Sequence, residues 1–557
     1  MSRCRTLLAT SAAMLSCACG AGEFAHELLP ATPSQRVVSR LVLPANATLH
    51  LAATVSRAND ESDLGLATWL YPAEGRAVEL IPDGETAPAS NRLEASYDLG
   101  TWAGESVLIS AVVMGAPRRR VTWQQAVVHG EGRPQEAAPA PPESPNVIVL
   151  LIDTLRADVL VTPEQAPATE NLRQLADEGL VFRNAMAPTT WTRSSVASIF
   201  TGLDPAAHGT HGRNHMLPES AHTLAERFRS RGYRTIGVIA NPNVGAQWGF
   251  DQGFDEYVRV EPRGKVDGES RPATAAQVYA EALGRIDRDP ADQRPIFVYA
   301  HTVDPHAPYD PVEWLLEESR PPGAVLPRDL SNWNGGTAPL DRERAMSLYR
   351  GEIAYADREL GLFRDELAAR GLLDDGLLVV TSDHGEQFGE HGQFGHGLTL
   401  FQEELAVPLI LFAPGRVEPG VINAPASLLD LAATLAGLVQ NASGSATGVD
   451  LLGSSIPEGR ELIADLRLAG LAWTALRQDS WKLLDDGGDR LPFLFDLDTD
   501  PGETSDLFAS TRRARPMRRR LRTLLEALES TALRETEINA PIDEKALEQL
   551  RALGYIQ

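Results

Sequence analysis

Acidic and histidine side chains follow two of the most apolar runs in the sequence. Asp153 ends the run NVIVLLID, and Asp383 and His384 end the stretch GLLVVTSDH. A single aspartate at the end of a strand is commonly a helix cap or a turn residue. Several carboxylates gathered at one edge of a sheet, however, repel one another and need a cation between them. Oxygen ligands with one imidazole suit a divalent ion, so the pattern predicts one Ca, Mg, Mn or Zn ion at this cluster.

The stretch TTWTRSSVASIFTG, at residues 189–202, places several hydroxyl groups at the start of a predicted helix. In one interpretation Thr192 lies at or near the N-cap, and Thr192 and Ser195 only cap the helix. In the other, a hydroxyl beside a metal attacks phosphorus or sulfur, because the positive helix N-terminus suits an anionic tetrahedral ester. From these residues alone, capping is the favoured interpretation.

The elements that would position these side chains are buried strands alternating with helices. Apolar runs at residues 146–153, 233–241, 295–306 and 376–386 are typical of strands buried on both faces, as in a parallel sheet. Helical patterns such as TENLRQLADEG and AHTLAERFRSRG lie between them. This alternation predicts a doubly wound α/β domain with a mostly parallel sheet, in which ligands bind at the carboxyl ends of the strands.

The chain before residue 146 differs in its composition and in its predicted elements. Arg3 and Arg5 precede a short apolar stretch, so residues 1–22 are predicted to be a signal peptide. Residues 23–130 hold short strand-like runs separated by turn residues, which predicts a β-sandwich-like accessory domain. A Pro/Ala-rich linker at 131–145 then precedes a catalytic domain at 146–557. Near the other end, residues 512–529 predict a helix with an apolar leucine stripe that packs on this domain.

The signal peptide implies export, to the periplasm, the outer membrane or the medium. The sequence MLSC resembles a bacterial lipobox, which would make Cys17 a lipid anchor; the alternative is a plain secretory signal. No other segment has the length of a membrane span. The formal net charge of -25 excludes nucleic acid as an expected partner, because phosphate backbones need basic surfaces.

A set of motifs runs in order from about residue 146 to the C-terminus and resembles the sulfatase family of the alkaline-phosphatase superfamily. The motifs are VIVLLIDTLRAD, TWTRSSVASIFTGLDPAAHG, GYRTIGVIAN, GFDQGFD, HTVDPHAPY, GEIAYADRELG, TSDHGEQFGEHGQFGHG, LAVPLILFAPG and LFDLDTDPGETSDL.

The resemblance implies roles for individual positions. Asp153, Asp383 and His384 match metal ligands of the family, and Thr192 matches the nucleophile, whose oxygen would be a further ligand. His306 resembles the histidine near the leaving oxygen of the substrate, and His396 falls where many members bind substrate through Lys or His. Arg156 is either an anion contact or an ordinary surface arginine of a first helical turn.

The chain also departs from the family pattern. Sulfatases proper convert a Cys or Ser at the nucleophile position to formylglycine, which Thr192 cannot form. Ser194 and Val196 stand where Pro and Arg are expected, and Thr154 replaces a second aspartate that many sulfatases carry. These features are similar to superfamily members that attack phosphate or phosphonate esters with a threonine alkoxide at a single metal.

The expected function is therefore an exported, metal-dependent hydrolase that cleaves phosphate-, phosphonate- or sulfate-type esters through a covalent Thr192 intermediate, with phosphoesters preferred. The expected substrate is a small-molecule, glycan or lipid ester. Three alternatives stay open: a sulfatase that uses unmodified Thr, an envelope phosphotransferase, and a non-catalytic protein that binds an envelope component.

Overall fold

The computed structural model divides into two compact units, one made of Met1–Pro72 with Glu79–Ala138 and the other of Ala73–Val78 with Pro139–Gln557. Residues 1–22, with the predicted signal peptide and Cys17, lie outside the described part of the chain. The structure describes residues 23–27, 29–30, 36–43, 45–55, 65–72, 78–80, 92–103, 106–114, 121–131, 144–160, 169–261, 265–266, 269–270, 272–307, 309, 339–439, 447–488, 491–533 and 536–537.

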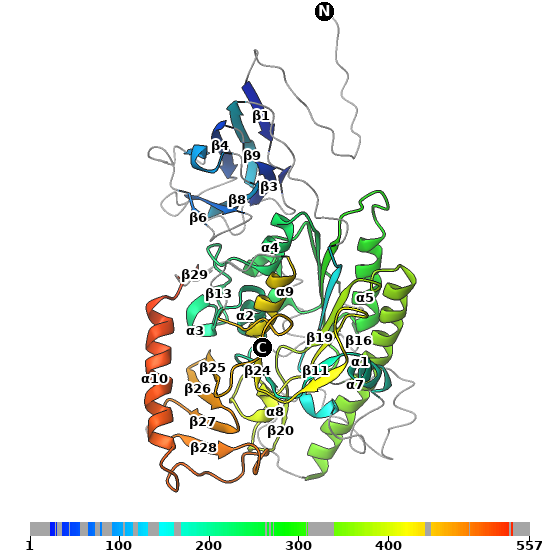
Figure 1. Cartoon of the computed structure of the whole chain (residues 1–557), viewed down its shortest axis with the longest axis vertical. Helices are drawn as coiled ribbons and strands as arrows, with labels where there is room; N and C mark the ends of the chain where they lie inside the picture. The colour runs from blue at the N-terminus through cyan, green and yellow to red at the C-terminus, as the bar shows by residue number, and fades with distance from the viewer. Residues whose placement is uncertain are drawn as a thin grey trace, which may run out of the picture. The chain divides into compact units, whose positions relative to one another are not determined.

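The described residues of the N-terminal unit form two antiparallel sheets, as predicted (Figure 1). Residues from both sheets share one hydrophobic core, where Leu49 and Val128 of one sheet meet Leu70 and Ile109 of the other. One sheet has the order β1 (Glu23–Glu27), β9 (Val121–Glu131), β4 (Ala45–Val55), β7 (Arg92–Asp98). The other has the order β2 (Leu29–Pro30), β3 (Arg36–Val42), β8 (Ser106–Met114), β5 (Gly65–Pro72), β6 (Val78–Glu79).

The larger unit is built on an eight-stranded sheet in which β22 alone runs antiparallel to its neighbours. The four strands predicted from apolar runs lie next to one another in it, with β10 between β18 and β19. Every residue of β10, β14, β18 and β19 is buried, which explains why these runs are continuously apolar. The order is β15 (Glu256–Arg259), β14 (Arg234–Ile239), β18 (Ile296–Thr302), β10 (Val147–Ile152), β19 (Leu377–Thr381), β22 (Leu409–Phe412), β11 (Leu180–Phe182), β23 (Gly420–Ile422).

Two groups of helices cover the sheet, which confirms the doubly wound α/β class (Figure 1). One group packs α2 (Thr192–Thr201), α4 (Leu224–Ser230) and α9 (Leu429–Leu438) together. The other packs α1 (Glu170–Glu178), α5 (Ala275–Ile286) and α7 (Pro339–Ala369). Shorter elements are α3 (Pro205–His208), β12 (Ala185–Met186) with β24 (Ala426–Ser427), β13 (His215–Met216) with β29 (Thr536–Glu537), and β16 (Lys265–Val266) with β17 (Glu269–Ser270).

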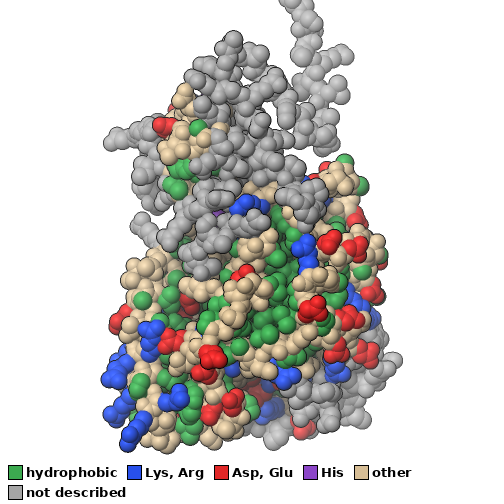
Figure 2. Space-filling model, in the orientation of Figure 1, with side chains coloured by type: hydrophobic (Ala, Val, Ile, Leu, Met, Phe, Trp, Pro, Cys, Tyr) green, Lys and Arg blue, Asp and Glu red, His purple; other side chains and the backbone are tan. Residues whose placement is uncertain are grey.

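A smaller antiparallel sheet follows, with four strands: β25 (Glu461–Leu468), β26 (Leu471–Gln478), β27 (Trp481–Asp485) and β28 (Phe493–Asp496). The predicted C-terminal helix is confirmed as α10 (Ala514–Ser530), whose leucine stripe, beginning with the buried Leu521, packs on this sheet. Figure 2 shows Lys and Arg side chains gathered at the lower left, where α10 lies in Figure 1. No helix among the described residues is both long and apolar enough for a membrane span.

Candidate active site

The helix α2 presents Thr192 as its first residue. Trp191 occupies the N-cap position and makes no side-chain capping bond. Thr192 is fully buried, and its Oγ1 atom lies 3.1 Å from Nε2 of His384. Ser195 donates its hydroxyl proton to the carbonyl of Asp383 at 2.7 Å. The capping interpretation is therefore wrong for both hydroxyls, which instead face the loop after β19.

That loop presents Asp383 and His384 with defined orientations. The imidazole Nδ1 of His384 lies 3.0 Å from the carbonyl of Gly385, so Nδ1 carries the proton and Nε2 offers a lone pair. One oxygen of Asp383, Oδ1, accepts a hydrogen bond from the backbone N–H of His384 at 3.1 Å. The other, Oδ2, is buried without a hydrogen bond from any described residue and lies 3.4 Å from Nε2 of His384.

Asp153, at the end of β10, is held in the same way. Its Oδ2 atom accepts hydrogen bonds from Nδ2 of Asn241 at 2.6 Å and from Nε2 of His301 at 3.1 Å. Its Oδ1 atom is buried, receives no hydrogen bond within the described part of the chain, and lies 4.0 Å from Nε2 of His384. Burial acts to raise the pKa of Asp153, but the hydrogen bond from His301 and the nearby imidazoles outweigh it and hold the pKa below its usual range.

These three residues fit a divalent cation. One ligand atom each from Asp153, Asp383 and His384 lies within 4.8 Å of the others, and all three side chains are buried. Burial and the charge of Asp153 raise the pKa of Asp383, as expected for two carboxylates in one dry site. Two buried carboxylate oxygens without hydrogen bonds, beside an imidazole lone pair, form a donor set that a cation would complete.

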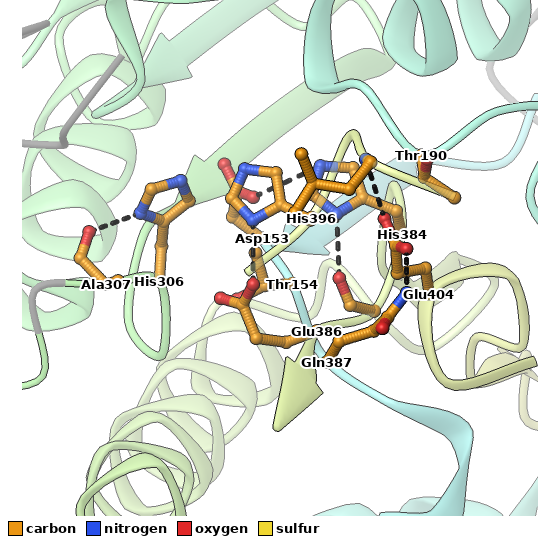
Figure 3. Close-up of polar contacts among 12 residues, drawn as sticks. Asp153, Thr154, Thr190, His306, Ala307, His384, Glu386, Gln387, His396 and Glu404 are labelled. Carbon is orange, nitrogen blue, oxygen red and sulfur yellow. Dashed lines mark hydrogen bonds and ion pairs between the residues drawn. The ribbon is translucent and has the colours of Figure 1, made fainter. Parts of the chain in front are cut away.

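Two further imidazoles lie beside this group. The rings of His384 and His396 have centroids 4.4 Å apart, and those of His396 and His306 are 4.8 Å apart, so the three stand side by side in Figure 3. Burial lowers the pKa of His306 to about 4, because it outweighs the carboxylates of Asp153 and Glu386, which act to raise that pKa. Burial acts in the same direction on His396, but the carboxylate of Glu386 outweighs it and raises the pKa to about 9.

A family model for sulfatases matches residues 145–441, which is more than half of the chain and includes every residue of this site. The chain belongs to the sulfatase family. An arylsulfatase from Clostridium perfringens is 23% identical over 356 residues, which cover 50% of this chain and 70% of the relative.

Solved structures agree in fold. A phosphonate monoester hydrolase from Silicibacter pomeroyi superposes with a TM-score of 0.58 and 21% identity, over 70% of this chain and 96% of that chain. A protein solved with its substrate D-glucosamine-2-N,6-O-disulfate gives a TM-score of 0.56 and 18% identity, over 70% of this chain and 98% of that chain. Family and fold together make this chain an ester hydrolase of the sulfatase family.

The guanidinium of Arg156 is engaged by carboxylates of this sulfatase-family chain. It forms ion pairs with Asp158 at 2.8 Å and with Glu390 at 2.9 Å, and its Nη1 atom also donates to the carbonyl of Glu386 at 3.0 Å. The bond to Glu386 places the guanidinium near the site. An anionic substrate would have to compete with the carboxylates of Asp158 and Glu390 for this guanidinium. Its role as an anion contact stays a prediction.

Some residues of the site received no role from sequence reasoning. Asn241 ends the apolar run before it, as Asp153 ends its own run, so the rule that ligands gather at the carboxyl ends of strands could have identified it. His301, near the end of β18, was recognised as part of the strand-end cluster by the same rule but was given no role of its own. Glu386 and Tyr309 carry no such signal, because hydrogen bonds made only in the folded chain connect them to the site.

Proposed function

We propose that this sulfatase-family hydrolase cleaves phosphate- or phosphonate-type esters through a covalent intermediate on Thr192. The observation that carries the proposal is the position of the Thr192 hydroxyl, which is buried at the N-terminus of α2, 3.1 Å from Nε2 of His384. Beside it lie Oδ1 of Asp153 and Oδ2 of Asp383, the two carboxylate oxygens without hydrogen bonds from described residues. A threonine at this position rules out formylglycine, because oxidation of a secondary alcohol gives a ketone. The nucleophile must then be the hydroxyl itself.

Asp153, Asp383 and His384 are the residues that would hold the cation, with the Thr192 oxygen alongside. A divalent ion there would favour ionisation of a nearby hydroxyl and offset negative charge on the ester. The N-terminus of α2 adds backbone N–H groups and a partial positive charge that favour the non-bridging oxygens.

In the proposed first step, Thr192 Oγ1 forms a bond to phosphorus as the bond to the ester oxygen breaks. The Thr192 hydroxyl loses its proton as it attacks, and His306 takes up a proton on Nε2 and donates it to the leaving oxygen, since its Nδ1 faces the carbonyl of Ala307 at 2.5 Å. His396, paired with a carboxylate, binds an anionic oxygen of the substrate. Water then cleaves the Thr192 ester; an alcohol in its place would give transfer instead.

Sulfate ester hydrolysis by unmodified Thr192 is the second candidate. The family itself favours it, as do the arylsulfatase and the disulfated glucosamine complex among the relatives. The two candidates differ in the nucleophile that they need, because the family reaches sulfate esters with formylglycine. A small-molecule or glycan ester fits either candidate.

The decisive experiment is a substrate panel on metal-replete protein: an aryl phosphate, a phosphonate monoester, a phosphodiester and an aryl sulfate. Thr192→Ala should lower kcat by about 10⁴-fold or more, because it removes the nucleophile, while Thr192→Ser should retain measurable turnover. Mass spectrometry of quenched wild-type enzyme should detect a phosphoryl or phosphonyl adduct on the peptide that holds Thr192. Full activity of Thr192→Ala would end the proposal, and turnover confined to the aryl sulfate would favour the second candidate.

We also propose that the protein is exported by its N-terminal segment and is anchored through a lipid on Cys17. The support is the order of basic, apolar and small residues in positions 1–22. Cell fractionation of the wild type and of Cys17→Ser tests this. A membrane-bound wild type and a released variant are expected; release of both proteins would favour a plain secretory signal.

A further inference from the structure

A short hairpin places Glu386 opposite His396. In this hairpin β20 (Gln387–Phe388) pairs antiparallel with β21 (Phe394–Gly395), and Gln387 is the partner of Gly395. One step further along the same register, Glu386 faces His396. The hairpin begins three residues after His384, so its register determines which side chain stands next to the imidazole at the site.

The carboxylate of Glu386 is completely buried, and each of its two oxygens has a hydrogen-bond partner. Its Oε1 atom lies 2.9 Å from Nδ1 of His396, and its Oε2 atom accepts a hydrogen bond from the hydroxyl of Tyr309 at 3.0 Å. Figure 3 shows this carboxylate and the His396 ring directed toward each other. The backbone carbonyl of Glu386 accepts a further bond from Arg156 at 3.0 Å. Both the side chain and the backbone of this residue are therefore fixed.

A carboxylate accepts hydrogen bonds and donates none, so the nitrogen of His396 that faces it must carry a proton. This contact determines the ring orientation and leaves Nε2 as the nitrogen on the opposite side of the ring. His306 has a different partner, since its Nδ1 faces the carbonyl of Ala307. The two neighbouring imidazoles are thus oriented by unlike acceptors, one anionic and one neutral.

We infer that Glu386 is the positioning residue for His396, and that Tyr309 in turn holds Glu386. Glu386 keeps the proton on Nδ1 of His396 and the ring at one angle, so that Nε2 meets the ester. This inference rests on the proposed function in one respect: the orientation of His396 affects turnover only if an ester binds against it. The competing explanation is a buried ion pair that stabilises the loop and nothing more.

A double-mutant cycle separates the two explanations. Glu386→Gln keeps the size of the side chain and should lower kcat/KM by about 10-fold or more in the wild-type background, as expected for loss of the group that orients a catalytic imidazole. In a His396→Ala background the same change should alter kcat/KM by less than about 2-fold, because the positioned group is gone. Equal losses in both backgrounds would overturn the inference in favour of the structural explanation.

The chain offers a matched control in Glu403. Its Oε1 atom lies 2.5 Å from Nδ1 of His391, so it forms a carboxylate–imidazole pair in the same region, but outside the catalytic group. Glu403→Gln should have the same small effect in both backgrounds. Tyr309→Phe provides a second test if Glu386→Gln does not fold: it should reduce kcat/KM in the wild-type background and not in His396→Ala.

A readout independent of turnover completes the experiment. Proton NMR of the wild type should show a downfield Nδ1–H resonance that is missing in His396→Ala and moves upfield in Glu386→Gln. If that resonance does not move, the inference is overturned whatever the enzyme does. If it moves while Thr192→Ala stays fully active, the positioning pair stands and the proposed covalent chemistry fails.

Discussion

The Oγ1 atom of Thr192 lies 3.1 Å from Nε2 of His384, although 192 positions separate the two residues. The contact forms because α2 begins at the edge of the sheet where β10 and β19 end. A second bond, from Ser195 to the carbonyl of Asp383, ties the same helix to the same loop. Two hydrogen bonds therefore join the start of α2 to the loop that holds Asp383 and His384, and changes to these proposed cation ligands should affect Thr192.

Removal of the metal should destabilise the protein, and Asp383→Asn should reverse that effect. The two carboxylates lie close together in a dry site, so metal-free wild type carries an uncompensated repulsion. Asparagine removes one charge while its oxygen can still accept the backbone N–H groups, so the metal-free variant should be more stable than metal-free wild type by about 1–3 kcal/mol.

Thermal unfolding with a chelator and with added Ca, Mg, Mn or Zn measures this. A free metal ion at about 100 times its Kd should stabilise the wild type by about 2.7 kcal/mol, and the variant far less. An equal gain in both proteins would show that the ion binds elsewhere.

Asn241→Ala should weaken metal binding without removing a ligand. Asn241 is one of two donors that hold Oδ2 of Asp153 and thereby direct Oδ1 toward the cluster. Loss of such an orienting group commonly weakens metal affinity by about 10- to 100-fold. Competition with a chromophoric chelator gives the affinity. Asn184→Ala is the matched control, because that side chain donates to the carbonyl of Asn423 at an exposed position. An affinity unchanged in Asn241→Ala would contradict the assigned role.

Lys482→Met should strongly destabilise the larger unit. Lys482 and Glu503 form an ion pair at 2.7 Å with both side chains fully buried, and Glu503 also accepts the backbone N–H of Gln402. Burial lowers the pKa of Lys482 and raises that of Glu503 in spite of their mutual attraction. Each charge is therefore unfavourable in this site without its partner.

Removing one partner of such a pair costs about 3–5 kcal/mol. The double variant Lys482→Met/Glu503→Gln should recover most of that loss, because no unpaired charge remains. Thermal unfolding of the two single variants and the double variant measures the recovery. A double variant as unstable as the sum of the single variants would mean that packing, not charge, dominates.

The pair of His391 and Glu403 should make stability depend on pH. Burial acts to lower the pKa of His391, but the hydrogen bond and charge of Glu403 outweigh it and raise the pKa above 6.5. The protonated histidine binds its partner best in the folded state. The pair therefore contributes stability that is fully present below pH 6.5 and lost as pH rises through the folded pKa.

Comparison of wild type with His391→Gln at each pH isolates this contribution. The difference in Tm should shrink above pH 6.5 and level off at the value due to stacking of His391 on Phe401, whose ring centroids are 3.6 Å apart. A difference in Tm that stays constant from pH 5.5 to 9 would refute the assignment.

The sequence by itself predicted the parallel sheet and the acidic and histidine side chains at the ends of its strands. Runs such as residues 147–152 are apolar throughout because both faces of the strand are covered, and that pattern survives without any knowledge of the partner strands. Asp153, Asp383 and His384 follow directly from such runs, since the strand ends of a parallel sheet share one edge. The predicted role of Thr192 as the nucleophile rests instead on the order of the family motifs, because the residues around it fit a helix cap equally well.

Only the tertiary structure decided which groups face each other across that edge. The hydrogen-bond partners of Asp153 come from the ends of β14 and β18. Glu386 faces His396 because of the register of a hairpin with two residues in each strand. Arg156, for which the sequence left an anion contact and a surface position both open, forms ion pairs with Asp158 and Glu390. Local sequence encodes burial and periodicity, whereas hydrogen-bond partners depend on distances of a few ångströms between segments far apart in the chain, and those distances are fixed only when the strands pack.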